Sequence, residues 1–82
     1  MIFGVYCIRD RKTGFMSPAV DMNDAAAIRN FEHACQQTSS LMYSHSGDYE
    51  LHKLGVFDSD TGYIDSHNPE VIASGYDFKK EV

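Results

Sequence analysis

The sequence predicts a small α+β domain of order ββαββ, a four-stranded antiparallel sheet with one helix on one face. Three observations lead to this prediction. Four segments are rich in β-branched and aromatic residues, and one segment has apolar residues at helical spacing. The pattern Asp-x-x-Thr-Gly-aromatic-aliphatic occurs twice, at Asp10–Met16 and Asp58–Ile64, each time between two strand-like segments. With 82 residues, 43% of them hydrophobic, residues 1–82 suit one domain with a small core.

The first predicted hairpin joins strands at Ile2–Arg9 and Phe15–Val20. The turn between them begins with Asp10 and ends with Gly14. Asp accepts backbone N–H bonds across a turn, and Gly adopts a positive φ without steric cost. Pro18 has no N–H to donate to a neighbouring strand, so the second strand is expected at an edge of the sheet.

The only strong helix signal lies between Met22 and Gln37. Asn23 is a favourable N-cap, and Asp24 lies in the first turn, where it favours the helix dipole. Apolar residues recur at spacings of three and four and form one stripe that we expect to face the sheet. This stripe consists of Ala27, Ile28, Phe31, Ala34 and Cys35.

The second half of the chain is predicted to be a loop, a strand at Tyr49–Asp58, a turn, and a fourth strand ended by Asn68-Pro69. The tail follows, and residues 79–82 are expected to be frayed. The helix joins strands two and three, which therefore run the same way and give the sheet order 2-1-3-4. This order places the two turns at opposite ends of the molecule. One end would be basic (Arg9, Arg11, Lys12) and the other acidic (Asp58, Asp60).

Several kinds of chemistry are not supported by the residue spacing. Asp58–Gly62 resembles the start of a calcium loop, but a calcium loop needs Gly at its sixth position and Glu at its twelfth, where this chain has Pro69. The chain has no C-x-x-C pair for zinc, no nucleophile elbow and no glycine-rich phosphate loop. Cys7 and Cys35 are expected to be reduced, buried thiols. We therefore expect no metal, no cofactor and no catalytic site.

The basic turn is the strongest candidate for a binding site. Its three cations lie close in sequence to aromatic residues, a combination suited to single-stranded nucleic acid, where bases stack and phosphates are neutralised. The opposing interpretation is an ordinary solvated hairpin, because the net charge of −5 opposes attraction to DNA. The predicted nucleic-acid-binding residues are Tyr6, Arg9, Arg11, Lys12, Phe15 and Arg29. No leader peptide or membrane span is expected.

Four segments in order resemble the small non-structural proteins of gokushovirus-type microviruses, which are single-stranded DNA phages. They are Tyr6–Pro18, Asn23–Phe31, Gly47–Ile64 and Ala73–Phe78. The helix-start motif of that family is matched by Asn23, Asp24, Ala25, Ala27, Ile28, Arg29 and Phe31. Its hairpin motif is matched by Asp48–Leu51, Gly55, Phe57, Asp58, Thr61 and Gly62.

The resemblance implies a non-enzymatic accessory protein that binds DNA and acts in genome replication or packaging, in the cytoplasm of the host cell. Family members are described as DNA-binding and as counterparts of the microvirus protein that switches genome synthesis toward packaging. Implied partners are single-stranded viral DNA and replication or packaging proteins of phage or host. The alternative is a dimeric interaction module that regulates replication or procapsid proteins without binding DNA. The sheet face opposite the helix is expected to carry apolar residues, which either a homodimer stacked sheet on sheet or the C-terminal tail would cover.

Overall fold

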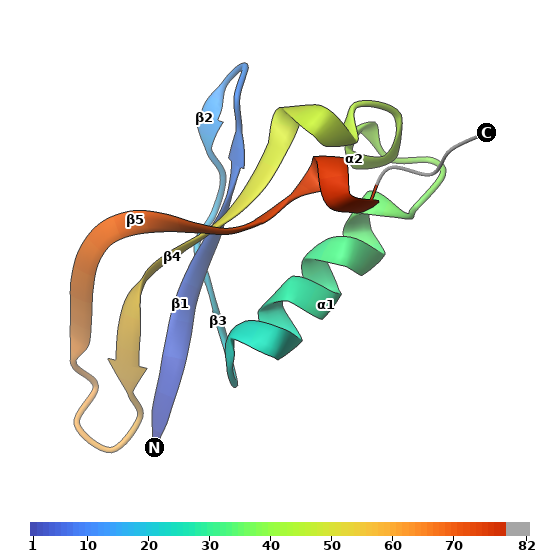
Figure 1. Ribbon diagram of the computed structural model, residues 1–82. Coiled ribbons are helices and arrows are strands. Elements are labelled where there is room, and N and C mark those ends of the chain that lie inside the picture. Colours follow the sequence, from blue (N-terminus) through green and yellow to red (C-terminus); the bar gives the residue numbers. More distant parts are fainter. Residues whose placement is uncertain (79–82) are drawn as a thin grey trace.

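The computed structural model describes residues 1–78 and confirms a small α+β fold with an antiparallel sheet and one main helix (Figure 1). The predicted fraying of residues 79–82 lies outside the described residues. The elements are β1 (Ile2–Asp10), β2 (Gly14–Phe15), β3 (Ala19–Asp21), α1 (Asp24–Cys35), α2 (Leu41–Ser44), η1 (Ser46–Asp48), β4 (Tyr49–Asp58), β5 (Ile64–Ser74) and η2 (Gly75–Phe78).

The sheet has five strands where four were predicted. The segment expected as one strand, Phe15–Val20, is interrupted before Pro18 and yields the two short strands β2 and β3. Both pair with the same edge of β1, so the order is β2-β1-β4-β5 with β3 beside β1. All pairings are antiparallel. The predicted edge position of the Pro18 segment is confirmed.

β5 continues through Asn68-Pro69, so the prediction that this pair ends the fourth strand is wrong. Lys53 of β4 pairs with Glu70 and Gly55 pairs with Ser66. Three residues of β5 therefore bulge out opposite one residue of β4. A bulge leaves its residues outside the hydrogen-bond ladder, which is where a proline without an N–H is tolerated.

The hydrophobic core lies between the sheet and α1. Phe31 of α1 is almost completely buried and packs edge-to-face on Phe78, with 5.9 Å between ring centres. Tyr6 and Leu51 contribute from the sheet. Burial of one large apolar side chain such as Phe31 stabilises the fold by about 1.5–3 kcal/mol. Phe78 thus docks the end of the described chain onto the core, whereas the Tyr76 side chain is mostly exposed.

The helix begins as the sequence predicts. The Asn23 side chain accepts a hydrogen bond from the Ala26 N–H at 2.8 Å. The expected loop before β4 instead contains α2 and η1, and Ser40 caps α2 by accepting from the Met42 N–H at 3.0 Å. Among the described residues, no helix is both long enough and apolar enough to cross a bilayer.

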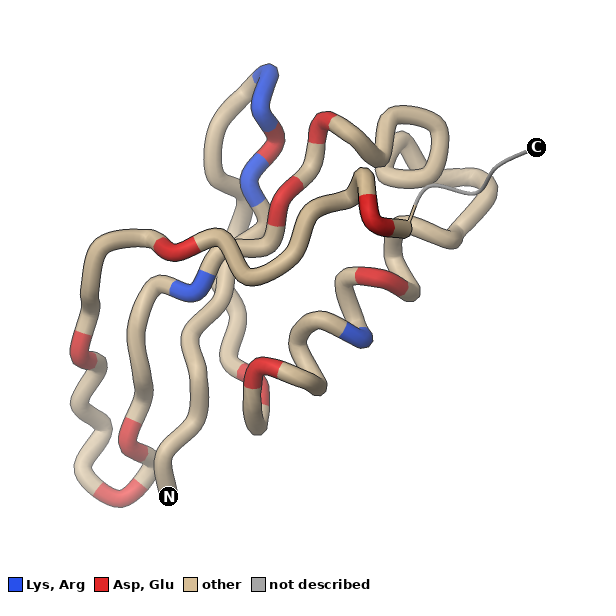
Figure 2. Tube along the Cα trace, viewed as in Figure 1, with Lys and Arg blue, Asp and Glu red and all other residues tan. Residues whose placement is uncertain are grey.

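The two copies of the repeated pattern form the same turn at opposite ends of the sheet. Asp10 accepts from the Lys12 N–H and Asp58 from the Asp60 N–H, each at 2.9 Å. Gly14 and Gly62 follow with φ values of +111° and +79°, which side chains with a Cβ rarely adopt. Figure 2 shows Lys and Arg at the β1–β2 turn and Asp at the β4–β5 turn, as predicted.

Candidate nucleic-acid interface

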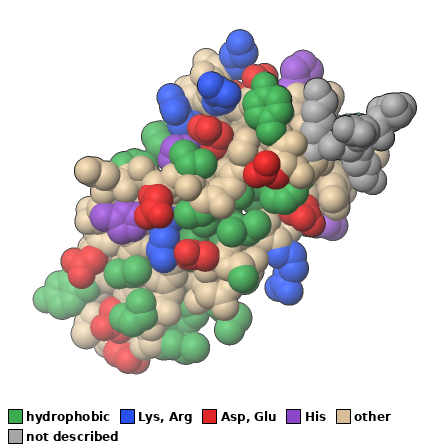
Figure 3. Space-filling view, in the orientation of Figure 1, with side chains coloured by type: hydrophobic (Ala, Val, Ile, Leu, Met, Phe, Trp, Pro, Cys, Tyr) green, Lys and Arg blue, Asp and Glu red, His purple; other side chains and the backbone are tan. Residues whose placement is uncertain are grey.

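The β1–β2 hairpin projects from one end of the molecule (Figure 1). The Arg11 N–H donates to the Asp48 carbonyl at 2.8 Å, which ties the hairpin to η1. Arg9, Arg11 and Lys12 are all exposed. Figure 3 shows Lys and Arg side chains gathered at this end with acidic side chains beside them, and further acidic and hydrophobic side chains toward the opposite end. The hairpin therefore presents three cations together, with Asp10 between Arg9 and Arg11 in the chain.

Phe15 supplies an aromatic surface beside these cations. Half of its surface is exposed, and the Arg9 guanidinium carbon lies 5.8 Å from the centre of its ring. Glu50 Oε1 lies 4.0 Å from the Arg9 guanidinium, so part of the Arg9 charge is offset. A half-exposed pair at this distance contributes little stability, about 0–1 kcal/mol, and leaves Arg9 free to take another anion.

Sequence reasoning missed His52 as part of this surface. Its side chain is buried and meets the Phe15 ring edge-to-face, with 5.1 Å between ring centres. His52 Nε2 lies 3.4 Å from Glu50, while its buried Nδ1 has no hydrogen-bond partner among the described residues. His52 thus contacts both Phe15 and Glu50 from the buried side of this surface. The alternation of side chains along β4 predicts that His52 and Glu50 share a face. The contact of His52 with Phe15, by contrast, could be predicted only from the strand pairing.

Tyr6 does not belong to this surface. Its side chain is only 3% exposed, and its hydroxyl donates to Asp24 Oδ1 at 2.6 Å. Burial, followed by the negative charge of Asp24, raises the pKa of Tyr6 far above its ordinary value. Lys53 Nζ lies 3.0 Å from the same carboxylate. A nucleotide base has no access to this ring, so the structure gives Tyr6 a role in joining α1 to the sheet.

Arg29 is also separate from the hairpin. It is exposed on α1, and Figure 1 shows this helix beside the sheet and apart from the β1–β2 turn. The structure therefore brings together four of the six predicted residues. These are Arg9, Arg11, Lys12 and Phe15.

The acidic end carries a cation that the sequence did not reveal. The amino group of Met1 lies 2.7 Å from Asp60 and 3.7 Å from Asp58. The turn hydrogen bond from the Asp60 N–H, together with this amino group, keeps the pKa of Asp58 below its ordinary value. Asp58 therefore remains charged at neutral pH, and this end opposes binding of a polyanion.

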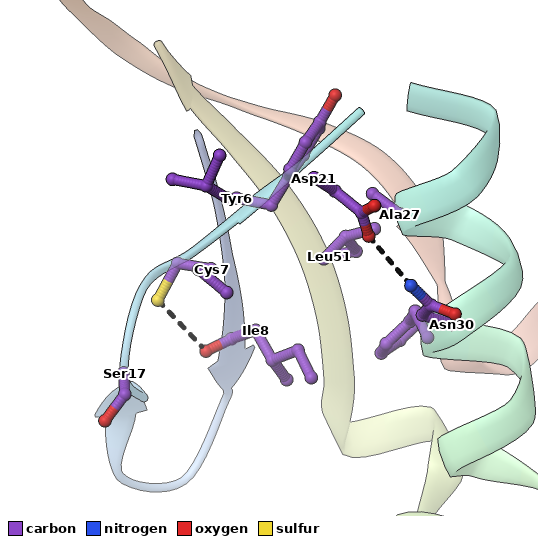
Figure 4. Close-up of a pocket in the computed structure, with 11 residues that line it drawn as sticks. Tyr6, Cys7, Ile8, Ser17, Asp21, Ala27, Asn30 and Leu51 are labelled. Atoms are coloured by element: carbon purple, nitrogen blue, oxygen red, sulfur yellow. Dashed lines mark hydrogen bonds between the residues drawn. The ribbon is translucent and has the colours of Figure 1, made fainter. Parts of the chain in front are cut away.

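A pocket of about 320 Å³ lies between α1 and strands β1 and β3 (Figure 4). Its walls include Tyr6, Cys7 and Leu51, and at its rim the Asn30 amide donates to Asp21 at 2.8 Å. No Lys or Arg lines it. It is therefore not an extension of the basic hairpin. Within residues 1–78, no three His, Cys, Asp or Glu side chains converge as a metal site would require.

Both cysteines are buried, as the sequence predicted. The Cys7 thiol donates to the Met16 carbonyl at 3.0 Å, and Cys35, the last residue of α1, points into the core. Burial raises the pKa of both thiols. Neither is therefore activated as a nucleophile.

Comparison with known proteins gives one match. The family described as "Phage ORF5 protein" matches residues 3–78, nearly the whole chain. No curated protein and no solved structure gives a significant match.

Proposed function

The chain belongs to the Phage ORF5 protein family, and from this premise we propose a non-enzymatic accessory protein of a microvirus-type phage that binds single-stranded DNA. It acts in genome replication or packaging in the cytoplasm of the host cell. The observation that carries the proposal is the projecting hairpin, where three exposed cations stand beside a half-exposed phenylalanine.

Each group of the hairpin has a distinct part in the proposed complex. Arg11 and Lys12 lie at the turn and contact phosphates, because their side chains are exposed and form no ion pair among the described residues. Phe15 stacks on a base, and Arg9 joins the phosphate contacts by exchanging Glu50 for DNA. Stacking of one base on an aromatic side chain contributes about 1–3 kcal/mol and tolerates any sequence.

The net charge of −5 does not prevent DNA binding in this proposal; it determines which end of the protein faces the DNA. Positive charge is concentrated at one end of a molecule whose longest dimension is 46 Å, several times the Debye length of about 8 Å at physiological salt. The acidic end is consequently screened from DNA bound at the hairpin. The polynucleotide approaches the basic end alone, with a modest affinity set by few phosphate contacts.

Fluorescence anisotropy of a labelled single strand, measured over a series of salt concentrations, tests the proposal. Three phosphate contacts predict a slope of log K against log salt of about −2, at roughly 0.7 per contact. The Arg11→Ala/Lys12→Ala variant should reduce the magnitude of this slope by about 1.4. Arg29→Ala is the matched control and should leave the slope unchanged.

Phe15→Leu separates stacking from charge. It keeps an apolar side chain but removes the ring, so affinity should fall while the salt slope stays constant. Absence of binding even at low salt, with the wild-type protein folded, would contradict the DNA-binding proposal as a whole.

A second candidate is a dimeric module that regulates replication or procapsid proteins without touching DNA. It is favoured by apolar side chains exposed on the sheet, among them Val20, Ile64 and Val71, each at least 50% exposed. Exposed apolar patches of this kind mark interaction surfaces. Capture of a phage replication or capsid protein by a variant that has lost DNA binding would favour this candidate over the first.

A further inference from the structure

The sheet face turned away from α1 carries several exposed apolar side chains. Directly paired residues point to the same side of a sheet. Tyr6 faces α1, so Val5 and Phe3 face the other way. Val5 pairs with Val20 of β3, and Phe3 pairs and stacks with Phe57 of β4.

Further apolar residues extend this open face toward both ends of the molecule. Ile64 pairs with Phe57 and is 62% exposed. Val71 pairs with His52 and is 51% exposed. Phe15 pairs with Arg9 near the basic turn. The open face, defined by Phe3, Phe15, Val20, Phe57, Ile64 and Val71, thus spans from the basic end to the acidic end.

We infer that the occupant of the open face is a second copy of this chain, stacked antiparallel about a two-fold axis perpendicular to the long dimension. Two sheets that stack through the same face have their two-fold axis in the plane between them. If the axis follows the long dimension, like-charged turns oppose each other. If the axis is perpendicular to the long dimension, the basic turn of each copy meets the acidic turn of its partner.

Charge complementarity selects the antiparallel arrangement. Arg11 and Lys12 at one end would face Asp58 and Asp60 of the partner subunit, twice per dimer because of the symmetry.

The test is a charge-reversal pair, followed by sedimentation velocity without DNA. Arg11→Glu/Lys12→Glu makes both ends acidic, and Ser59→Lys/Asp60→Lys makes the second end basic. Each variant alone should have its dimer dissociation constant raised by at least about tenfold, because like charges then oppose each other. An equimolar mixture should regain the wild-type dissociation constant by forming heterodimers.

Salt and a surface control complete the test. The wild-type dimer should weaken as salt rises, whereas a parallel dimer would strengthen because salt screens repulsion between like ends. Arg29→Glu reverses a charge on α1, away from the open face, and should leave the dimer unchanged. Circular dichroism of each variant confirms that it is folded.

Three results would overturn the inference. The first is a wild-type protein that stays monomeric at low salt and about 100 μM, a concentration at which even weak interfaces assemble. The second is a dimerisation that neither charge reversal changes. The third is an equimolar mixture of the two folded variants that stays monomeric. The inference does not depend on the proposed function, but the dimer covers Phe15 and occupies Arg11 and Lys12, so dimerisation and DNA binding at the hairpin compete. A protein that dimerises in this way and binds no DNA even well below its dimer dissociation constant would contradict the proposed function alone, and a monomer that binds DNA would contradict this inference alone.

Discussion

The Tyr6→Phe variant tests whether Tyr6 joins the helix to the sheet, as the structure indicates. The substitution removes one oxygen and leaves the buried ring in place, so no cavity forms beyond the hydroxyl. What is lost is the 2.6 Å hydrogen bond from the Tyr6 hydroxyl to Asp24 at the start of α1. Lys53 remains beside the same carboxylate.

The expected loss follows from the environment of the bond. A hydrogen bond to a charged partner contributes about 1.5–3 kcal/mol. The Asp24 side chain is 49% exposed, so solvent screening reduces this to about 1–2 kcal/mol. In a domain of this size, such a loss lowers Tm by about 4–16 °C.

The same bond predicts how the loss depends on pH. The hydrogen bond from Tyr6, and then the one from Lys53, lower the pKa of Asp24 in the folded state. The stability that Asp24 contributes through these bonds is present above its unfolded pKa of about 4 and is lost as the pH falls through its folded pKa. Burial raises the pKa of Tyr6, so its contribution is present below about pH 10 and is lost as pH rises further.

The difference in unfolding free energy between wild type and Tyr6→Phe should therefore be constant between about pH 4 and pH 10. It should decrease below and above this range. Urea denaturation followed by circular dichroism measures it at each pH. Tyr63→Phe is the matched control, because Tyr63 is exposed and should change stability by less than about 0.5 kcal/mol. A difference equally small for Tyr6→Phe, or one that does not vary with pH, would refute this reasoning.

Three further substitutions or reactions test the packing. Gly55→Ala would place a Cβ against a β5 backbone carbonyl, so urea denaturation should show a loss of at least about 2 kcal/mol in the free energy of unfolding. Wild-type stability of this variant would show that β4 and β5 separate easily there. Phe31→Ala removes the most buried ring and should cost about 3–5 kcal/mol, leaving Phe78 without its partner; a loss below about 1 kcal/mol would contradict the described core. Cys7 and Cys35 should react slowly with a thiol reagent in the native protein and rapidly in denaturant, because burial raises the pKa of both; fast native labelling of either would place it at the surface.

The elements that the sequence predicts well are those with local causes. The N-cap at Asn23 and the apolar stripe of α1 depend on residues within a few positions of each other, and both are found as predicted. The same holds for the two turns, where Asp and Gly act four residues apart. Their opposite positions followed from the short connections and the single helix.

The features that the sequence did not predict depend on strand pairing. Leu54 is an extra residue in β4 opposite β1, so the alternation of side chains shifts there. Leu51 consequently faces the core, whereas Phe57 stacks on Phe3 on the opposite face, although alternation predicts one shared face. The path of β5 through Pro69 has the same origin. No local signal distinguishes a bulged strand from a strand that ends.

The residues of the candidate site also fall into those placed by local sequence and those placed by strand pairing. Arg9, Arg11 and Lys12 are neighbours in sequence and stay together in space. Tyr6 is three residues from Arg9, but on a strand this odd spacing turns it to the opposite face, into the core. Its proximity along the chain was therefore misleading, whereas Phe15 reaches the site through its pairing with Arg9.

The two matching turns give this chain ends whose charge evolves independently of its fold. In each turn, the Asp and the Gly fix the backbone. The two residues after the Asp have exposed side chains, and within residues 1–78 only at the second turn do these side chains make a contact, from Ser59 and Asp60 to Met1. Because such exposed contacts contribute about 0–1 kcal/mol, exchange of those residues is expected to cost little stability. A lineage would in this way change what each end attracts, or make the ends alike, through one or two substitutions on an unchanged scaffold.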